Sequence, residues 1–310
     1  MPALLSPLSF PHRPAHTVQR SSPMKRVHRP AHPGPSSIAR AFEVLELFSP
    51  SQPLLKVEDV ALRLDYTRST AYRYVGELCD AGLLVAASGG HYALGPRVIE
   101  LEQLLRMTDP LYLAACRVLP PLHSEHSVLL LQNLYGDRVL CIYAEGPATL
   151  EHAGRRVTVK RTRGTPFPLF RGAASLALLA WMPADRIREI FLRHATEIAS
   201  RGLGTDWESF RATLAAIRRQ GYATSGGQLA PDLFGVAVPV VAGSERRVIG
   251  SLVRIFLREA NETDTEADEA RCAQDLKAIA ADLATEFLRA SRLAQSEPAF
   301  PRAAQKKERQ

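Results

Sequence analysis

The sequence predicts a protein of the α/β (α+β) class, in which a small unit of helices and a β-hairpin precedes a larger unit built on an antiparallel sheet. Two observations predict this organisation. Over residues 36–95, three helical apolar periods are followed by a glycine-tipped hairpin pattern. After residue 110, strand patterns joined by short turns are interspersed with helical ones, which is typical of a sheet covered by helices. With 310 residues, 46% of them hydrophobic, the chain can bury two separate cores.

Most of the positive charge lies at the two ends of the chain. The formal net charge is +7; residues 1–35 contribute +5 and residues 291–310 contribute +3, which leaves −1 for the rest. The basic balance is therefore weak evidence for nucleic-acid binding. We expect residues 1–35, a basic extension rich in Pro and His without periodicity, and the tail 291–310 to be disordered.

Three helices are expected before residue 83. An apolar stripe from Ile38 to Phe48 predicts the first, and residues 57–64 predict the second. Thr67 can cap a third helix, and Gly82 can end it by adopting the left-handed conformation. Its expected buried face comprises Ala71, Tyr74, Val75 and Leu78.

A β-hairpin is expected after the third helix. The apolar runs Leu83–Val85 and His91–Leu94 flank a tip, Ala86–Gly90, that contains two successive glycines. Three helices and a hairpin make a winged helix-turn-helix, which we assign to residues 36–95.

The third helix has the polar face of a DNA recognition helix. Ser69, Tyr72 and Arg73 lie opposite its apolar face, and Thr67 and Arg68 crowd its start. In a helix-turn-helix, the start of this helix enters the major groove, where Arg can bond guanine and hydroxyl groups can reach phosphates or bases. A merely solvated polar face is the alternative. The preceding turn and the following wing favour double-stranded DNA as a partner.

A linker helix is expected over residues 96–109. Its apolar face cannot be covered by so small a domain as the winged helix. It either pairs with its copy in a dimer or packs on the second domain. The face comprises Val98, Leu101, Leu104 and Leu105.

The second domain is expected over residues 110–290. Its predicted helices are Leu113–Leu122, Ala173–Trp181, Asp185–His194, Trp207–Gln220 and a final one from Thr265 to Ala290. Its predicted strands are Val128–Leu134, Val139–Glu145, Val157–Lys160, Gly235–Val241 and Val248–Leu257.

The start of the helix at Ala173 is a candidate anion site. Small residues there leave backbone N–H groups uncovered, so that they can receive a carboxylate, and Arg171 can add a charged partner. A tightly packed helix start with Arg171 in solvent is the alternative. Gly226-Gly227 and the loop to Gly235 are shaped like the lip of a pocket, although such turns often serve geometry alone.

No enzyme, metal or cofactor site is expected. His123, Glu125 and His126 form a cluster without a third-ligand motif, and the four cysteines form no CxxC pair. No phosphate-binding loop, nucleophile elbow or metalloprotease motif is present. No apolar run approaches the roughly 20 residues that span a bilayer, and the dispersed cysteines fit a reducing compartment, so we expect no membrane partner and a cytoplasmic location.

Five collinear segments resemble the IclR family of prokaryotic transcriptional regulators, over residues 36–290. They are SSIARAFEVLELF, VEDVALRLDYTRSTAYRYVGELCDAGLL, HYALGPRVIEL, PFPLFRGAASLALLAWMP and RRQGYATSGGQLAPDLFGVAVPVV. The resemblance implies an effector-binding domain with a GAF-like fold. It also implies homodimers, or dimers of dimers, on palindromic operators.

The resemblance also implies site residues. Arg73 matches the usual arginine of the recognition helix, and the DNA-facing start of that helix comprises Thr67, Arg68, Ser69, Thr70 and Tyr72. Ala173 and Ala174 match positions whose backbone amides cradle a carboxylate in some relatives. The implied ligand-binding set comprises Phe170, Arg171, Gly172, Ala173, Ala174, Ser225, Leu233, Gly235, Ser251 and Val253.

The sequence departs from the family pattern in its second domain. Gln228 stands where an acidic residue is common, Asp232 where Gly is common, and Val253 where Ser is frequent. With Phe167 and Phe170, Val253 suggests an aromatic or larger apolar acid as effector. We thus expect a DNA-binding regulator, repressor or activator, modulated by a small organic acid. The alternatives are a winged-helix DNA-binding protein without an effector, and an enzyme using Cys141 or His126 with an accessory winged helix.

Overall fold

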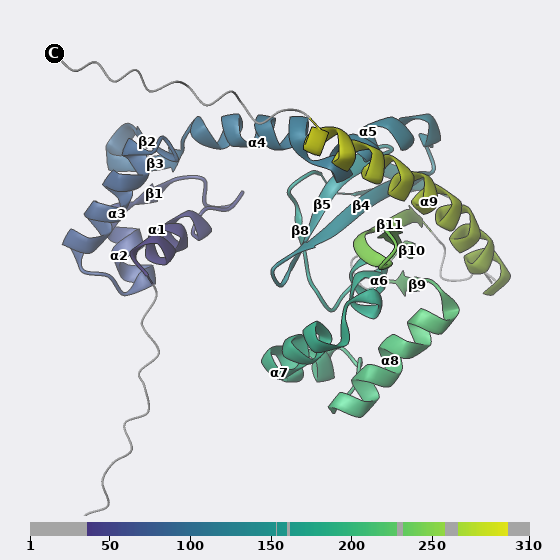
Figure 1. The fold of residues 1–310 in the computed structure, drawn as a ribbon. Helices are drawn as coiled ribbons and strands as arrows, with labels where there is room; N and C mark the ends of the chain where they lie inside the picture. The colour runs from purple at the N-terminus through teal and green to yellow at the C-terminus, as the bar shows by residue number, and fades with distance from the viewer. Residues whose placement is uncertain (1–35, 153, 160–161, 228–231, 258–265, 297–310) are drawn as a thin grey trace, which may run out of the picture. The chain divides into compact units, whose positions relative to one another are not determined.

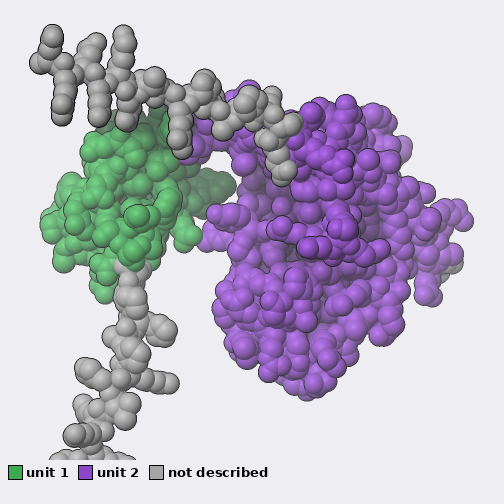
Figure 2. Space-filling model, in the orientation of Figure 1, with its two compact units in different colours: residues 1–97 green, residues 98–310 purple. Residues whose placement is uncertain are grey.

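The computed structural model describes residues 36–152, 154–159, 162–227, 232–257 and 266–296 (Figure 1). The extension 1–35 and residues 297–310, both expected to be disordered, lie outside these ranges. The chain divides into two compact units, residues 1–97 and 98–310 (Figure 2). None of the helices in the described ranges has a stretch both long and apolar enough to span a bilayer.

The first unit is a winged helix-turn-helix, which confirms the predicted fold. Its helices are α1 (Ser37–Glu46), α2 (Val57–Leu64) and α3 (Arg68–Asp80). Strands β1 (Leu55–Lys56), β2 (Leu84–Ala87) and β3 (His91–Leu94) pair in the order β1-β3-β2, with both pairs antiparallel.

Local side-chain and backbone contacts fix the ends of these helices. Ser36 Oγ accepts a hydrogen bond from the N–H of Ala39 at 3.2 Å and so caps α1. After α3, Gly82 adopts a φ of +72°, and its carbonyl oxygen would lie 2.2 Å from any Cβ added at Gly95. Glycine is therefore required at both positions where the chain enters and leaves the hairpin.

Three details of this unit differ from the expected elements. Helix α1 ends at Glu46, because the chain turns before Pro50. Strand β1, only two residues long, is too short to show a period in the sequence. The wing tip narrows to a 3₁₀ turn at Ser88–Gly90, in which both glycines have positive φ.

The second unit begins with helices α4 (Arg97–Thr108) and α5 (Pro110–Val118). Its described strands form a six-stranded antiparallel sheet in the order β8-β5-β4-β11-β10-β9. These strands are β4 (Ser127–Tyr135), β5 (Arg138–Glu145), β8 (Pro166–Phe167), β9 (Ala223–Gly226), β10 (Leu233–Ala242) and β11 (Arg247–Leu257). Strands β6 (Thr149–His152) and β7 (Arg155–Thr158) form a separate hairpin.

Helices cover both faces of this sheet. The remaining helices are α6 (Ala173–Trp181), α7 (Ala184–Ser200), α8 (Trp207–Gln220) and α9 (Glu266–Ser296). Leu130 and Val253 share a core with α6 and α8, whereas Leu129 and Leu252 share the opposite core with α5 and α9. In Figure 1, α9 runs beside α5 at the top of the sheet and α6 lies beneath it. Alternation along each strand thus supplies both cores.

Helix α6 is the most buried of these helices. Its first eight residues, Ala173–Ala180, are all buried, so it has no solvated face. A helix that is apolar all round belongs in the interior of a domain.

Several boundaries in this unit differ from the prediction. The helix expected at Leu113–Leu122 ends at Val118, because Pro120 and Pro121 cannot donate helical hydrogen bonds. Helix α7 continues to Ser200 through a non-helical residue, His194, where it was expected to end. Helix α9 extends to Ser296 instead of Ala290. The strand expected at Val157–Lys160 is shifted to β7, and Lys160 itself lies outside the described residues.

Candidate functional site

The start of α3 is organised by its N-cap, Thr67. The Oγ1 of Thr67 accepts a hydrogen bond from the N–H of Thr70 at 3.2 Å, and it also lies 3.1 Å from Ser69 Oγ and 2.8 Å from Thr70 Oγ1. Thr67 and Ser69 are exposed and Thr70 is partly exposed, so their three hydroxyl groups form a compact polar tip on the helix. Such a tip can donate to phosphates or base edges.

Two arginines flank this polar tip and both are held from within the unit. Arg68 pairs with Glu58 of α2 at 2.6 Å, and this contact lowers the pKa of Glu58. Arg73 lies with its Cζ 4.8 Å above the ring of Tyr74 and its Nε 4.0 Å from Glu77. Its side chain stays 58% exposed. These contacts restrain the side chain of Arg73 and leave guanidinium N–H groups available to donate hydrogen bonds.

Helix α3 has one buried and one exposed face, as the sequence predicts. Tyr74 is 1% exposed, whereas Tyr72 is 52% exposed and carries its phenol outward. A Cβ added at Gly76 would meet no atom within 4 Å. The fold itself therefore does not require glycine at position 76.

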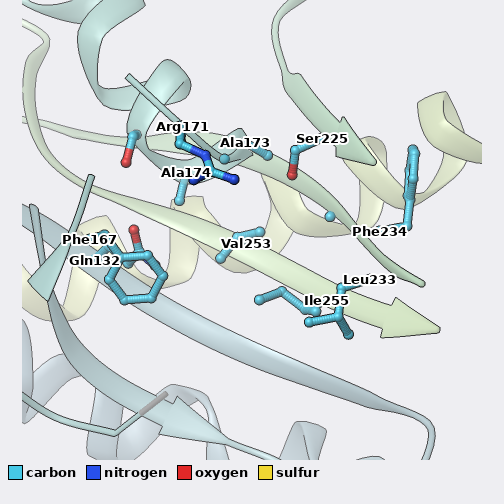
Figure 3. Close-up of a pocket in the computed structure, with 13 residues that line it drawn as sticks. Gln132, Phe167, Arg171, Ala173, Ala174, Ser225, Leu233, Phe234, Val253 and Ile255 are labelled. Carbon is cyan, nitrogen blue, oxygen red and sulfur yellow. The ribbon is translucent and has the colours of Figure 1, made fainter. Parts of the chain in front are cut away.

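A cavity opens at the start of α6, between this helix and the sheet (Figure 3). It encloses about 440 Å³ of empty space, including its open mouth. The lining residues are Gln132, Phe167, Arg171, Gly172, Ala173, Ala174, Ser175, Ser225, Leu233, Phe234, Gly235, Val253 and Ile255.

The N-terminus of α6 gives this cavity its anion-binding character. Gly172, the N-cap residue, has a φ of +84°, and no side chain caps the helix. The first N–H groups of an α-helix have no partner within it, and the helix dipole adds positive potential there. Since Ala173 and Ala174 carry only methyl groups, their side chains do not cover these N–H groups. No described residue pairs with the guanidinium of Arg171, which lines the same end of the cavity.

The sheet supplies the other wall. Val253 and Ile255, two residues apart on β11, face the cavity together with Leu233 of β10. A Cβ added at Gly235 would lie 3.2 Å from Ser225 Oγ and 3.5 Å from Val253 Cγ2. Glycine at position 235 therefore keeps open the space between these two side chains.

Eight of the ten ligand-binding residues expected from the sequence line the cavity, namely Arg171, Gly172, Ala173, Ala174, Ser225, Leu233, Gly235 and Val253. Phe170 and Ser251 are not among the lining residues. The ring of Phe170 is buried, with its centroid 5.4 Å from that of His194. Ser251 is fully buried on β11. Gln228, marked as a departure from the family pattern, lies outside the described residues.

Four further lining residues were not predicted from the sequence, namely Gln132, Ser175, Phe234 and Ile255. Ile255 could have been predicted, because it lies two residues after Val253 and therefore on the same face of the strand. Gln132 could not have been predicted, since its position depends on the pairing of β4 with β11, which are more than a hundred residues apart in the chain.

The other candidate clusters have structural partners. His123 bonds Glu145 at 2.6 Å and Glu125 at 3.1 Å, and these carboxylates raise its pKa. Cys141 is 1% exposed. Across the described residues, no group of three His, Cys, Asp or Glu side chains could hold a metal ion.

Comparison with known proteins assigns both units. Residues 37–87 match the model of the IclR helix-turn-helix domain, and residues 130–285 match that of the bacterial transcriptional regulator IclR C-terminal domain. The Pca regulon regulatory protein of Pseudomonas putida is 26% identical over 210 residues, which cover 67% of this chain and 70% of that protein.

Solved structures agree with this assignment. The IclR transcriptional regulator of Alicyclobacillus acidocaldarius is 27% identical with a TM-score of 0.61, covering 81% of this chain and 98% of that one. An IclR homologue of Microbacterium hydrocarbonoxydans, solved in complex with 4-hydroxybenzoate, is 25% identical with a TM-score of 0.56, covering 82% and 100%. The family comprises transcriptional regulators, which are not enzymes. With a DNA-binding helix-turn-helix and a C-terminal effector domain, this chain belongs to the IclR family.

Proposed function

We propose that the chain binds a palindromic operator through α3 and that a small carboxylic acid in the α6 cavity controls this binding. The cavity at the uncapped start of α6 is the observation that carries the proposal. Backbone N–H groups and the guanidinium of Arg171 favour an anionic group at that end. The apolar side chains of the sheet favour a hydrophobic body.

An aromatic acid suits these walls best. Phe167 on β8 and Val253 and Ile255 on β11 offer flat and branched apolar surfaces. The valine, in place of a hydroxyl-bearing residue, removes polarity from the middle of the wall. The 4-hydroxybenzoate bound by the Microbacterium homologue is an acid of this class.

DNA contact is proposed for six residues at the start of α3, of which Thr70 is partly exposed and the other five are exposed. These are Thr67, Arg68, Ser69, Thr70, Tyr72 and Arg73. Arg73 has the reach and the free donors for guanine in the major groove, and the hydroxyl groups suit phosphates. Because Glu58 already holds Arg68, we assign Arg68 to backbone positioning more than to base reading.

A route from the cavity to the linker helix passes through Arg163. This residue lies four positions before Phe167 of the cavity wall, and its Nε donates to Glu102 of α4 at 2.7 Å. Its Nη1 donates to the carbonyl of Ile142 at 3.0 Å, and its Cζ lies 4.2 Å above the ring of Tyr112. A ligand that shifts Phe167 would therefore also shift Arg163, which binds α4 through Glu102.

The apolar face of α4 is proposed to pair with its copy. Its members Val98, Leu101, Leu104 and Leu105 are all exposed, and Leu104 and Leu105 are each more than half exposed. Burying such a stripe against a second α4 would form a homodimer, and two dimers can associate further. A dimer with two α3 helices matches a palindrome, since the half-sites mirror the protein's two-fold symmetry.

Thermal stability in the presence of benzoate and 4-hydroxybenzoate tests the ligand half of the proposal. Binding to the folded state raises the melting temperature by mass action. The Arg171→Met variant should lose most of this shift, whereas Arg211→Met, which removes an exposed arginine of α8, should keep it. Stabilisation by very small keto acids alone would contradict the aromatic class, and no shift with any acid would contradict the proposal.

Genome-wide mapping of bound DNA tests the other half and supplies the operator. Fluorescence anisotropy on that DNA, with and without the acid, then measures the control directly. DNA affinity that no stabilising acid changes would contradict the regulatory link.

A further inference from the structure

Gln132 is a buried polar residue in the wall of the cavity. Its side chain is 1% exposed and lines the cavity at the level of Phe167 (Figure 3). No atom of the described residues forms a hydrogen bond with its Oε1, although this atom is shielded from solvent. A buried carbonyl oxygen without a partner is costly, and an apolar residue of the same size would avoid that cost.

A second unpartnered polar atom lies beside it. Ser251 of β11 is the register partner of Gln132 of β4, so the two side chains project from the same face of the sheet. Ser251 is fully buried, and its Oγ has no hydrogen-bond partner among the described residues. The same face carries Val253 and Ile255, which line the cavity.

The regular alternation of β4 turns Gln132 toward this position. With Val128 and Leu130 it occupies every second place of the strand, opposite Ser251, Val253 and Ile255 of β11, on the face that shares a core with α6. The pairing of β4 with β5 skips Ile142, so the extra residue of this bulge lies on β5. The strand therefore presents Gln132 to the cavity side of the sheet.

We propose that Gln132 determines ligand specificity and that the effector carries, besides its carboxylate, a hydroxyl group that donates to Gln132 Oε1. The inference rests on the proposed function, because it assumes that the cavity holds the acid. The hydroxyl group of the ligand then satisfies the buried Oε1 of Gln132, which lines the cavity. The ligand class is thus a hydroxylated organic acid, and its unsubstituted analogue binds less tightly.

The test compares ligands that differ by one hydroxyl group. The probes are benzoate and its 2-, 3- and 4-hydroxy derivatives, titrated by calorimetry against the full-length protein. Wild type should bind at least one hydroxybenzoate about tenfold more tightly than benzoate, the effect of one hydrogen bond to a buried partner. In Gln132→Met, which keeps the length of the side chain, the ratio should fall to about one, because the hydroxybenzoate loses about tenfold more affinity than benzoate does.

Gln220→Met, at the exposed end of α8, is the matched control and should retain the wild-type ratio. Equal affinity of wild type for benzoate and all three derivatives would overturn the inference while leaving the proposed function intact. Equal loss of all ligands in Gln132→Met would also overturn it, because a structural role does not discriminate between them. If no acid binds to wild type, the inference and the proposed function fail together. The comparison of benzoate with its hydroxy derivatives on wild type tests the preference for a hydroxyl group even if the variant misfolds.

Discussion

Replacing Gly76 with Ala should stabilise the first unit and weaken its binding to DNA. Position 76 lies within α3, where glycine is less favourable than alanine by about 1 kcal/mol. The added methyl group would meet no atom within 4 Å, so no steric cost offsets this gain. For a domain of this size, about 1 kcal/mol raises the melting temperature by roughly 4–8 °C.

The same methyl group projects from the exposed side of α3, where a close DNA backbone would meet it. We therefore expect a more stable protein with lower operator affinity, measured by calorimetric melting and by fluorescence anisotropy on mapped operator DNA. Gly82→Ala is the matched control, because the positive φ of +72° at Gly82 disfavours alanine and the change should destabilise the unit by about 1 kcal/mol.

Two results would refute this reasoning. A lower melting temperature for Gly76→Ala would contradict the helical and uncrowded position of the residue. Unchanged operator affinity would contradict a close approach of α3 to DNA at this point, and the glycine would then have no explanation in the fold or in the interface.

Three further predictions concern other parts of the molecule. Arg73→Ala should abolish specific operator binding in an anisotropy titration while ligand-induced thermal shifts persist; retained specificity would remove Arg73 from base reading. Arg163→Met should leave acid binding intact but reduce the effect of the acid on DNA affinity, because the link to Glu102 is lost; an undiminished effect would exclude this route. The carboxylate of Glu145 raises the pKa of His123 above 6.5, so its stabilising contact is present below that pH and is lost as the pH rises through the folded-state pKa. Urea unfolding should show that wild type loses this stability as the pH rises above 6.5 and that His123→Gln does not; identical pH profiles would contradict the contact.

Much of the fold could be predicted because local chemistry acts on neighbouring residues. Thr67 caps α3 by accepting a hydrogen bond from the backbone of Thr70, three positions away. Gly82 has a positive φ, which turns the chain from the end of α3 into the hairpin. The boundaries of α8 follow from its apolar period, and those of α6 follow from the predominantly apolar run Ala173–Trp181. Short edges such as β1 and β8 escaped prediction, because two residues carry no period and pair only when a distant strand reaches them.

The candidate site divides in the same way. The uncapped helix start at Gly172–Ala174 and the polar tip of α3 are properties of consecutive residues, so both could be predicted without the tertiary structure. The opposite wall was decided only by tertiary structure. Gln132 and Ser251 meet because β4 and β11 pair in one particular register, and Phe170 leaves the expected set because its ring packs against His194 instead. Backbone propensity acts over a few residues, whereas the composition of a cavity depends on which distant strands come together to bury both cores.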